Sequence, residues 1–261
     1  MSKISIVTVT YNCVNDVERT VKSVINQDYA DKEYIIIDGN SQDGTKELLD
    51  QYKSNFNYFI SEPDKGIYDA MNKAIRVAKG EWLVFMNAGD SFASSTVLSE
   101  ISSTGFLAIA DVIYANVIQA FKDRKKFLRT YDKIAAERVP YEVCHQATLP
   151  KTNWLKKIEF DTSYKICADC DTFVKIKKAG GIFVFAPITM AYFEVSCGTT
   201  ARNIKLMYKE RRRIDGNPPL GGKDIINYCK CLFRFLVMRF LPQSVYEKMM
   251  FKYMSNLYPE V

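Results

Sequence analysis

Short apolar runs rich in β-branched residues alternate with segments of helical spacing over the first hundred residues. Four of these runs are bounded by turn residues and predict strands buried on both faces: ISIVTVT (4–10), YIIIDG (34–39), NYFI (57–60) and EWLVFM (81–86). Between them apolar residues recur at helical intervals, as at Val17, Val21 and Val24. This alternation predicts an α/β fold with a mostly parallel central sheet and crossover helices.

The pattern changes at about residue 105. DVIYANVIQAF (111–121) predicts a hairpin or paired short strands, and YEVCHQATL (141–149) predicts another strand. ADCDTFVKIKKAGG (168–181) predicts a helix ended by its Gly-Gly pair, followed by the apolar runs IFVFAP and ITMAYFEV. We expect these elements to complete a mixed sheet in the same domain.

Two basic helical segments follow residue 200, RNIKLMYKERRRI (202–214) and DIINYCKCLFRFLVMRFL (224–241). Residues 201–261 hold 12 Lys or Arg and 5 Asp or Glu of the chain's 36 and 30, so the whole basic excess lies there. We therefore expect a first half of the domain at 1–104, a second half at 105–200 and a basic helical appendage at 201–261.

Composition narrows the class of protein. With 261 residues, 48% of them hydrophobic, the chain is long enough to bury a core. Seven scattered cysteines and an N-terminus without a secretion signal favour a reducing, cytoplasmic location. Cys167 and Cys170 have C-x-x-C spacing, but a redox pair or half a zinc site is disfavoured because there is one histidine and no second cysteine pair at zinc-ribbon distance.

Polar residues follow each of the four predicted strands. They are TYN (10–12), DGNSQDG (38–44), SEPDKG (61–66) and NAGD (87–90). Loops are polar in any protein, yet the carboxyl ends of parallel strands meet at one edge, where α/β sheets bind ligands. GNSQDGTK lacks the lysine order of a P-loop and no G-x-G-x-x-G follows the first strand, so a nucleotide would be held another way. Two carboxylates in one loop, Asp38 and Asp43, suit a base or ribose better than a phosphate.

Three ordered motifs make the resemblance specific: SIVTVTYN, IIIDGNSQDGT and SEPDKGIYDAMNKAIRVAKGEWLVFMNAGD. Over residues 3 to about 200 the chain resembles the inverting family 2 glycosyltransferases, most closely the non-processive branch that builds bacterial surface polysaccharides. The resemblance implies a GT-A fold, with a nucleotide-binding half fused to an acceptor-binding half. It also implies transfer of one sugar from a nucleotide-diphosphate donor, a UDP-sugar being favoured, to a saccharide or polyprenyl-diphosphate-linked acceptor.

The resemblance implies a donor site. Its contact candidates are Thr8, Thr10, Tyr11 and Asn12 after the first strand, Asp38 as the acid that meets the base, Asp64, Lys65, Gly66 and Asn72 over the ribose and sugar, and Asn87, Ala88 and Gly89. NAGD lies where the family usually has D-x-D, so Asp90 would bind a divalent metal, Mn²⁺ or Mg²⁺. Asn87 and Gly89 replace frequent acids, so the diphosphate and water would hold much of the metal.

The resemblance also implies an acceptor side. ADCDTF matches a segment that carries the general base, which places Asp169 in that role, although both acids there could instead complement the helix dipole. On a helix Asp169 and Asp171 point about 200° apart, so only one can face the site. His145 and Gln146 match a segment near the acceptor. A lone histidine in an apolar segment is also a common hydrogen-bonded core residue.

The basic tail leaves three interpretations open. The segment 224–241 is too short and charged to span a bilayer, so it lies on an anionic membrane surface, packs on the catalytic domain or self-associates. Nucleic acid is a poor partner because no recognisable module is present. Two rivals to a glycosyltransferase remain: a non-catalytic sugar-nucleotide-binding scaffold, and a nucleotidyltransferase, whose glycine-rich first loop this sequence lacks.

Overall fold

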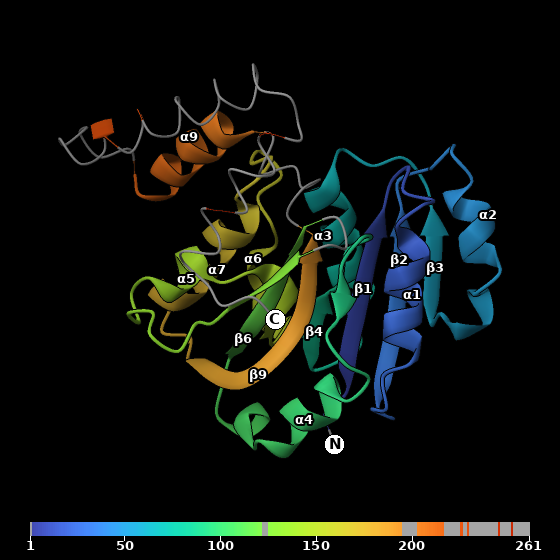
Figure 1. Cartoon of the computed structure of the whole chain (residues 1–261), viewed down its shortest axis with the longest axis horizontal. Coiled ribbons are helices and arrows are strands. Elements are labelled where there is room, and N and C mark those ends of the chain that lie inside the picture. The colour runs from blue at the N-terminus through green and yellow to red at the C-terminus, as the bar shows by residue number, and fades with distance from the viewer. Residues whose placement is uncertain are drawn as a thin grey trace. The chain divides into compact units, whose positions relative to one another are not determined.

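The computed structural model describes residues 2–121, 125–194 and 203–216, and single residues beyond them (Figure 1). The chain forms two compact units, Met1–Ile118 with Thr130–Phe193, and Gln119–Arg129 with Glu194–Val261. All the site residues predicted above lie in the first unit. The boundaries predicted at 104 and 200 stay predictions.

A parallel sheet forms the first part of the chain. Its strands are β1 (Ile4–Thr10), β2 (Lys32–Asp38), β3 (Tyr58–Ser61) and β4 (Trp82–Phe85), in the order β3-β2-β1-β4. Helices α1 (Val17–Ile25), α2 (Thr45–Asp50) and α3 (Ile67–Val77) and the 3₁₀ turn η1 (Lys53–Asn55) connect them. This confirms the predicted alternation.

Burial differs along this sheet. Strands β1 and β4 are buried throughout and β2 from its second residue on, as predicted, whereas β3 is partly exposed and its Tyr58 is 37% exposed. The prediction that all four strands are buried on both faces is therefore wrong for β3. The reason is its position, since an edge strand has a neighbour on one side only.

The strand order fixes where a ligand site would lie. From β1 to β3 the chain moves outward along the sheet, and it then returns to place β4 on the other side of β1. Right-handed crossovers put α1 and α2 on one face and α3 on the other, and Figure 1 shows α1 in front of the sheet and α3 behind it. The order reverses between β1 and β4, so the loops after these two strands flank the switch point.

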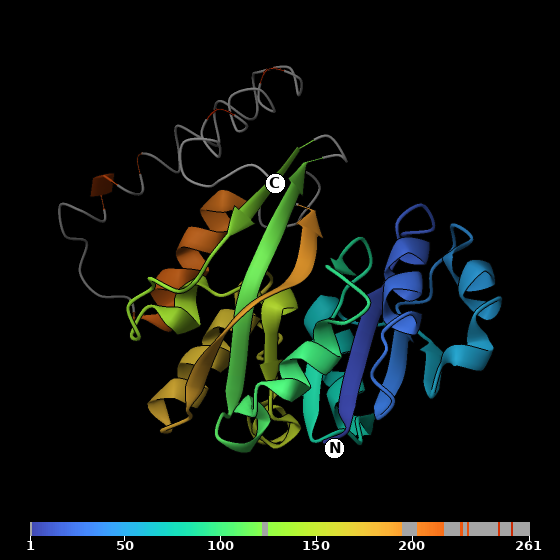
Figure 2. The same cartoon turned by 60° about the horizontal axis from the view of Figure 1, so that its bottom comes forward.

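A second, mixed sheet follows. Its strands are β5 (Ser91–Phe92), β6 (Val112–Phe121), β7 (Lys125–Arg129), β8 (Thr148–Pro150) and β9 (Phe183–Glu194). The order is β5-β9-β6-β7, with β8 antiparallel to β6. Figure 2 shows the two long strands of this sheet, β6 in green and β9 in orange, next to each other. The predicted mixed sheet is confirmed, but IFVFAP and most of ITMAYFEV form one long strand, β9.

The segment 141–149 differs from its prediction. It is not one strand: helix α5 (Val139–Glu142) and the 3₁₀ turn η3 (His145–Ala147) precede the short strand β8. Pro140 lies in the first turn of α5, where its missing N–H is not needed, and this favours a helix over a ladder. His145 is thereby placed on a turn instead of inside a strand.

Four further helical elements lie in the first unit. They are α4 (Val97–Ser103), η2 (Phe106–Ala108), α6 (Thr152–Ile158) and α7 (Ala168–Lys178). Helix α7 ends as predicted: Gly180 has φ 89°, a left-handed conformation that glycine adopts without a steric cost.

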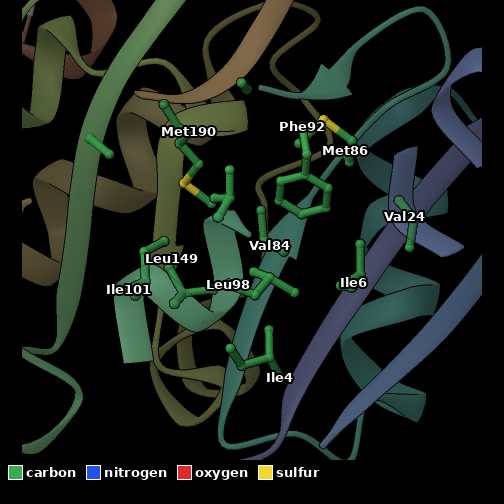
Figure 3. Packing of buried hydrophobic residues seen from close by; sticks show 14 of the residues in the cluster. Ile4, Ile6, Val24, Val84, Met86, Phe92, Leu98, Ile101, Leu149 and Met190 are labelled. Carbon is green, nitrogen blue, oxygen red and sulfur yellow. The ribbon is translucent and has the colours of Figure 1, made fainter. Parts of the chain in front are cut away.

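One hydrophobic core joins the two sheets. Figure 3 shows side chains from both sheets and from the helices meeting in it: Ile4 and Ile6 of β1, Val84 of β4, Phe92 of β5, Leu98 and Ile101 of α4, Leu149 of β8 and Met190 of β9. All of these are at most 4% exposed. Burial on this scale anchors the carboxyl ends of β1 and β4 in a packed scaffold.

The basic appendage is described in part. Helix α9 (Ile204–Ile214) confirms the first predicted basic helix. The second predicted helix, 224–241, lies outside the described residues, apart from a few single positions. Within the described part of the chain, no helix has the length and apolar character needed to cross a membrane.

Candidate active site

Asp38 is the centre of a hydrogen-bond network at the end of β2. Its carboxylate is fully buried and accepts from the hydroxyls of Thr10 (2.8 Å), Ser41 (2.5 Å) and Ser61 (2.6 Å), and from the backbone N–H of Ser41 (2.9 Å). Burial opposes ionisation, but these hydrogen bonds outweigh it and hold the pKa of Asp38 below its ordinary value. Four donors fill the acceptor sites of a carboxylate, so direct contact with a base would need one of them to give way.

The loop after β1 presents an exposed ring beside this network. Tyr11 is 66% exposed, and its ring lies against Gly39, where an added Cβ would stand 3.1 Å from it. The Asp64 carboxylate packs on the same glycine. A Cβ added at Gly39 would lie 2.6 Å from its Oδ2, so any side chain at position 39 would displace Asp64. Asn12 has φ 47°, and its side chain accepts from the N–H of Gln42 (2.9 Å). Tyr11, Asn12 and Asp64 therefore lie at the edge where the sequence predicts the nucleotide.

The NAGD turn, 87–90, follows β4 and is held from both sides. Thr20 of α1 accepts from the N–H of Gly89 (3.0 Å) and donates to the carbonyl of Asp90 (2.6 Å), while Arg19 donates to the carbonyl of Gly89. Gly89 has φ 97°, which a side chain rarely adopts. The Asp90 carboxylate accepts from the Gln146 amide (2.7 Å). The sequence did not predict Arg19 and Thr20 as residues of the site, because polar residues are expected on one face of an amphipathic helix such as α1.

A chain of contacts joins this turn to the predicted base. The ring of His145 lies between the Asn87 amide (Nε2 to Nδ2, 3.1 Å) and the Asp169 carboxylate (Nδ1 to Oδ2, 3.0 Å). Tyr68 of α3 donates to the other Asp169 oxygen (3.2 Å) and to the carbonyl of Ile166 (2.6 Å). The NAGD turn and Asp169 are thus one imidazole ring apart. Tyr68 was missed as a site residue, although it lies inside the DKGIYDAMNK motif.

The surroundings of Asp169 favour its ionised form. Burial opposes the charge, but the hydrogen bond from His145, the N–H of Cys170 and the hydroxyl of Tyr68 together hold the pKa of Asp169 below its ordinary value. Burial, and then the charge of Asp169, raise the pKa of Tyr68 well above 10. Tyr68 therefore stays a neutral donor, and Asp169 is a carboxylate able to accept a proton.

Several predicted residues have their polar atoms engaged inside the protein. Thr8 donates to the carbonyl of Met86 (2.7 Å), and the Asn72 amide both donates to and accepts from the backbone of Phe160 (2.8 Å each). Asp171 pairs with Lys175 on its own helix (2.6 Å) while Asp169 meets His145. Of the donor-loop candidates, Lys65 is exposed, Gly66 donates to Asp64 (2.8 Å), and Ala88 packs against the core. Direct contacts of these residues with substrates stay predictions.

The NAGD turn has the donor set of a weak divalent-cation site. Asp90 is 6% exposed and supplies one carboxylate, and the buried Oδ1 of Asn87, three residues earlier in the same turn, has no hydrogen-bond partner. No group of three His, Cys, Asp or Glu residues that could hold a metal occurs in the described part of the chain. One carboxylate and an amide oxygen suit Mg²⁺ or Mn²⁺, which commonly takes its other ligands from substrate phosphates.

Known sequences resemble this chain over part of its length. A PGL/p-HBAD biosynthesis glycosyltransferase of Mycobacterium bovis is 27% identical over 174 residues, 64% of this chain and 66% of that protein. An uncharacterized glycosyltransferase of Mycobacterium tuberculosis is 40% identical over 98 residues, 37% of each chain. The matched stretches are thus less than two thirds of either relative.

Solved structures resemble it over most of its length. S. aureus TarS 1–349 in complex with UDP-GlcNAc has a TM-score of 0.67 at 18% identity, covering 91% of this chain and 73% of that one. The mannosyltransferase PcManGT from Pyrobaculum calidifontis, in complex with GDP-Man and Mn²⁺, has a TM-score of 0.64 at 16% identity, covering 88% and 68%. The likeness confirms the predicted GT-A fold.

The sequence profile of glycosyl transferase family 2 matches residues 5–152, more than half of the chain. The match begins in β1 and ends just beyond β8, so it includes the NAGD turn, His145 and Gln146. Together with the fold, it shows that this chain belongs to glycosyl transferase family 2.

Proposed function

We propose that this protein transfers one sugar, with inversion, from a nucleotide-diphosphate sugar to an acceptor hydroxyl. The observation that carries the proposal is the His145 contact, which sets Asp169 one ring away from the turn that contains Asp90. Direct displacement needs a base near the acceptor and charge stabilisation near the leaving group, and we assign these two roles to Asp169 and Asp90.

The donor would lie across the switch point between β1 and β4. Tyr11 offers an exposed ring for the base, and Asp64 and Gly66 flank the start of α3. Of the structural neighbours, TarS was solved with UDP-GlcNAc and PcManGT with GDP-Man. We favour a UDP-sugar because TarS has the higher TM-score, 0.67 against 0.64. We expect Asp38 to shape this site mainly through Thr10, Ser41 and Ser61.

Asp90 and Asn87 would hold a divalent cation, Mn²⁺ or Mg²⁺. When bound, the cation neutralises charge that develops on the departing diphosphate. Gln146 orients the Asp90 carboxylate from one side, and Thr20 fixes the backbone of the same turn. Gly89 keeps side-chain bulk out of the turn and allows its φ of 97°.

Asp169 performs the proton transfer in this proposal. Its carboxylate takes the proton of the acceptor hydroxyl as that oxygen forms a bond to the anomeric carbon. The bond from this carbon to the diphosphate oxygen breaks, and the nucleoside diphosphate leaves with the electron pair. Tyr68 and His145 hold the two carboxylate oxygens in place, which keeps the base ionised and oriented.

The acceptor is proposed from the class of relatives. One of them is named a PGL/p-HBAD biosynthesis glycosyltransferase and another a cholesterol galactosyltransferase, so a saccharide or a lipid-linked sugar is the acceptor class we propose. We also propose that the basic appendage contacts an anionic membrane surface, where a lipid-linked acceptor would lie.

A donor panel tests the proposal. The purified protein is incubated with common sugar nucleotides and Mn²⁺ or Mg²⁺, and released nucleoside diphosphate is measured for wild type and Asp90→Ala. We expect metal-dependent release from one donor, reduced by the substitution. If wild type releases nothing but binds nucleotide in calorimetry, the non-catalytic scaffold is favoured. Absence of both release and binding would refute the proposed function.

A further inference from the structure

His145 and Gln146 each hold one residue of the NAGD turn. The His145 ring meets the Asn87 amide, and the next side chain, Gln146, donates to Asp90 (2.7 Å). Both come from the same 3₁₀ turn, η3. On its other edge the His145 ring meets Asp169. One side chain is therefore shared by the donor side and the base.

Hydrogen-bond chemistry fixes the roles of its two nitrogens. The amide Nδ2 of Asn87 can only donate, so Nε2 of His145 accepts and, in the neutral ring, Nδ1 carries the hydrogen. That hydrogen points at the Asp169 carboxylate, which has no hydrogen to donate when it is ionised and can therefore only accept. If the Asn87 amide were turned over, its oxygen would face Nε2, and Nε2 would have to carry the hydrogen. A neutral ring has only one such hydrogen, and Asp169 requires it on Nδ1. The base, the ring and the amide thus select one another's orientation.

This arrangement leaves one buried atom unused. Asn87 is 8% exposed, its Nδ2 is engaged by His145, and its Oδ1 has no hydrogen-bond partner. A buried amide oxygen without a hydrogen-bond partner is energetically unfavourable, so a ligand that meets it is favoured. The oxygen belongs to the turn that carries Asp90, and amide oxygens are ordinary ligands of hard cations.

We propose that His145 is a positioning residue that serves both halves of the site. Its Nδ1–H orients Asp169, and its Nε2 orients the Asn87 amide so that Oδ1 acts as a second oxygen ligand, beside Asp90, for the divalent cation of the donor complex. The inference rests on the proposed function, because it assigns the cation to that donor. His145 itself touches neither the cation nor the reacting atoms.

Two substitutions separate the two contacts. His145→Asn keeps an N–H near the position of Nδ1, for Asp169, but is too short to reach Asn87. His145→Gln places an amide oxygen near the position of Nε2, for Asn87, but provides no donor at Nδ1. A purely structural role would make the two variants alike, whereas the proposed role predicts opposite defects.

The first readout is binding without turnover. Calorimetry measures the affinity for UDP with Mn²⁺, or for whichever nucleoside diphosphate the wild type binds best among UDP, GDP and dTDP. We expect His145→Asn to weaken this affinity about tenfold and His145→Gln to change it by less than about threefold. Asn87→Ala should weaken it as much as His145→Asn, and the double variant should lose no more than either.

The second readout is turnover of the donor found in the panel. We expect kcat to fall about 10- to 100-fold in His145→Gln and less in His145→Asn, since only the latter keeps the donor to Asp169. Thermal melting checks that the variants fold. If the histidine variants do not, Asn87→Ala decides by itself, because unchanged Mn²⁺ and nucleotide affinity would refute the role of its oxygen.

The outcomes separate this inference from the function on which it rests. Equal affinities in wild type, His145→Asn and Asn87→Ala, or equal losses in both histidine variants, would overturn the inference while wild-type donor release left the function standing. A wild type that binds no nucleoside diphosphate would refute the function itself. If no donor turns over, the affinity pattern still decides the inference.

Discussion

Two carboxylates, Asp38 and Asp169, are both held ionised, yet their surroundings differ. Asp38 is fully buried and accepts four hydrogen bonds, all from residues of the strand ends and loop around it. The Asp169 side chain is 19% exposed and is held by His145 and Tyr68, which come from two other elements. Both pKa values lie below the ordinary value because hydrogen bonds outweigh burial.

The difference leads us to propose a structural role for Asp38 and a catalytic role for Asp169. Asp38 has its acceptor sites filled, so it ties the ends of β1, β2 and β3 together and has little capacity left for a ligand. Asp169 keeps access to solvent and connects, through His145, to an amide whose oxygen is unpaired. We therefore expect loss of Asp38 to affect mainly stability and loss of Asp169 to affect mainly turnover.

The largest expected effect is on catalysis. Asp169→Asn should lower donor turnover about 10³-fold, because an amide cannot take the proton of the acceptor. Its melting temperature should stay close to that of the wild type, since an amide can still meet Tyr68. Asp171→Asn is the matched control: it lies two residues on in α7, pairs with Lys175, and should keep most activity. Equal losses in both variants would contradict the assignment of Asp169.

The next effect is on stability. Asp38→Ala should lower the free energy of unfolding by about 3 kcal/mol, because it leaves the buried donors of Thr10, Ser41 and Ser61 without an acceptor. Urea denaturation measures this, with the exposed Asp50→Ala as a control expected within about 0.5 kcal/mol of wild type. A stable Asp38→Ala variant that has lost nucleotide binding would show that Asp38 acts on the ligand instead.

The sequence predicted the fold where local pattern decides it. The strands β1, β2 and β4 and the helix α7 have strong patterns and clear ends, and they were predicted close to their observed bounds. The spacing of Val17, Val21 and Val24 likewise predicted α1. The segment 141–149 was not, because its apolar residues fit a strand equally well and the helix depends on Pro140 and on packing. The exposure of β3 depends on strand order, which no local pattern carries.

For the site, the sequence predicted which residues gather but not how they connect. Motif spacing singled out Asn87, Asp90, His145 and Asp169 separately. Their linkage needs contacts between residues far apart in sequence, such as Asn87 with His145, which lie 58 positions apart and 3.1 Å from each other. The saturation of Asp38 and the engaged amide of Asn72 are likewise properties of packing, so the sequence could not tell a framework residue from a ligand contact.

A smaller effect is expected at the exposed edge of the donor side. Tyr11→Ala should weaken nucleotide affinity about tenfold through loss of base stacking. It should leave the melting temperature unchanged, since the ring is 66% exposed. Tyr11→Phe keeps the ring and should bind like wild type. Calorimetry with the nucleoside diphosphate of the preferred donor measures both, and an unchanged affinity in Tyr11→Ala would remove Tyr11 from the base site.

The smallest effect is a shift in the pH profile, and it tests how Asp169 is kept ionised. Asp169 must be ionised to accept a proton, so kcat/KM falls as the pH drops through its pKa. The groups that face this carboxylate are His145 of η3, Tyr68 of α3 and the N–H of Cys170 on its own helix, and each lowers the pKa of Asp169. Tyr68→Phe removes one hydroxyl and keeps the ring, so the pKa rises and the acid limb moves to higher pH. The shift should be smaller than that of His145→Gln, because the hydrogen bond of His145 is the stronger influence. An unmoved limb in Tyr68→Phe would mean that the hydroxyl serves the Ile166 carbonyl alone, leaving His145 as the side chain that sets the base.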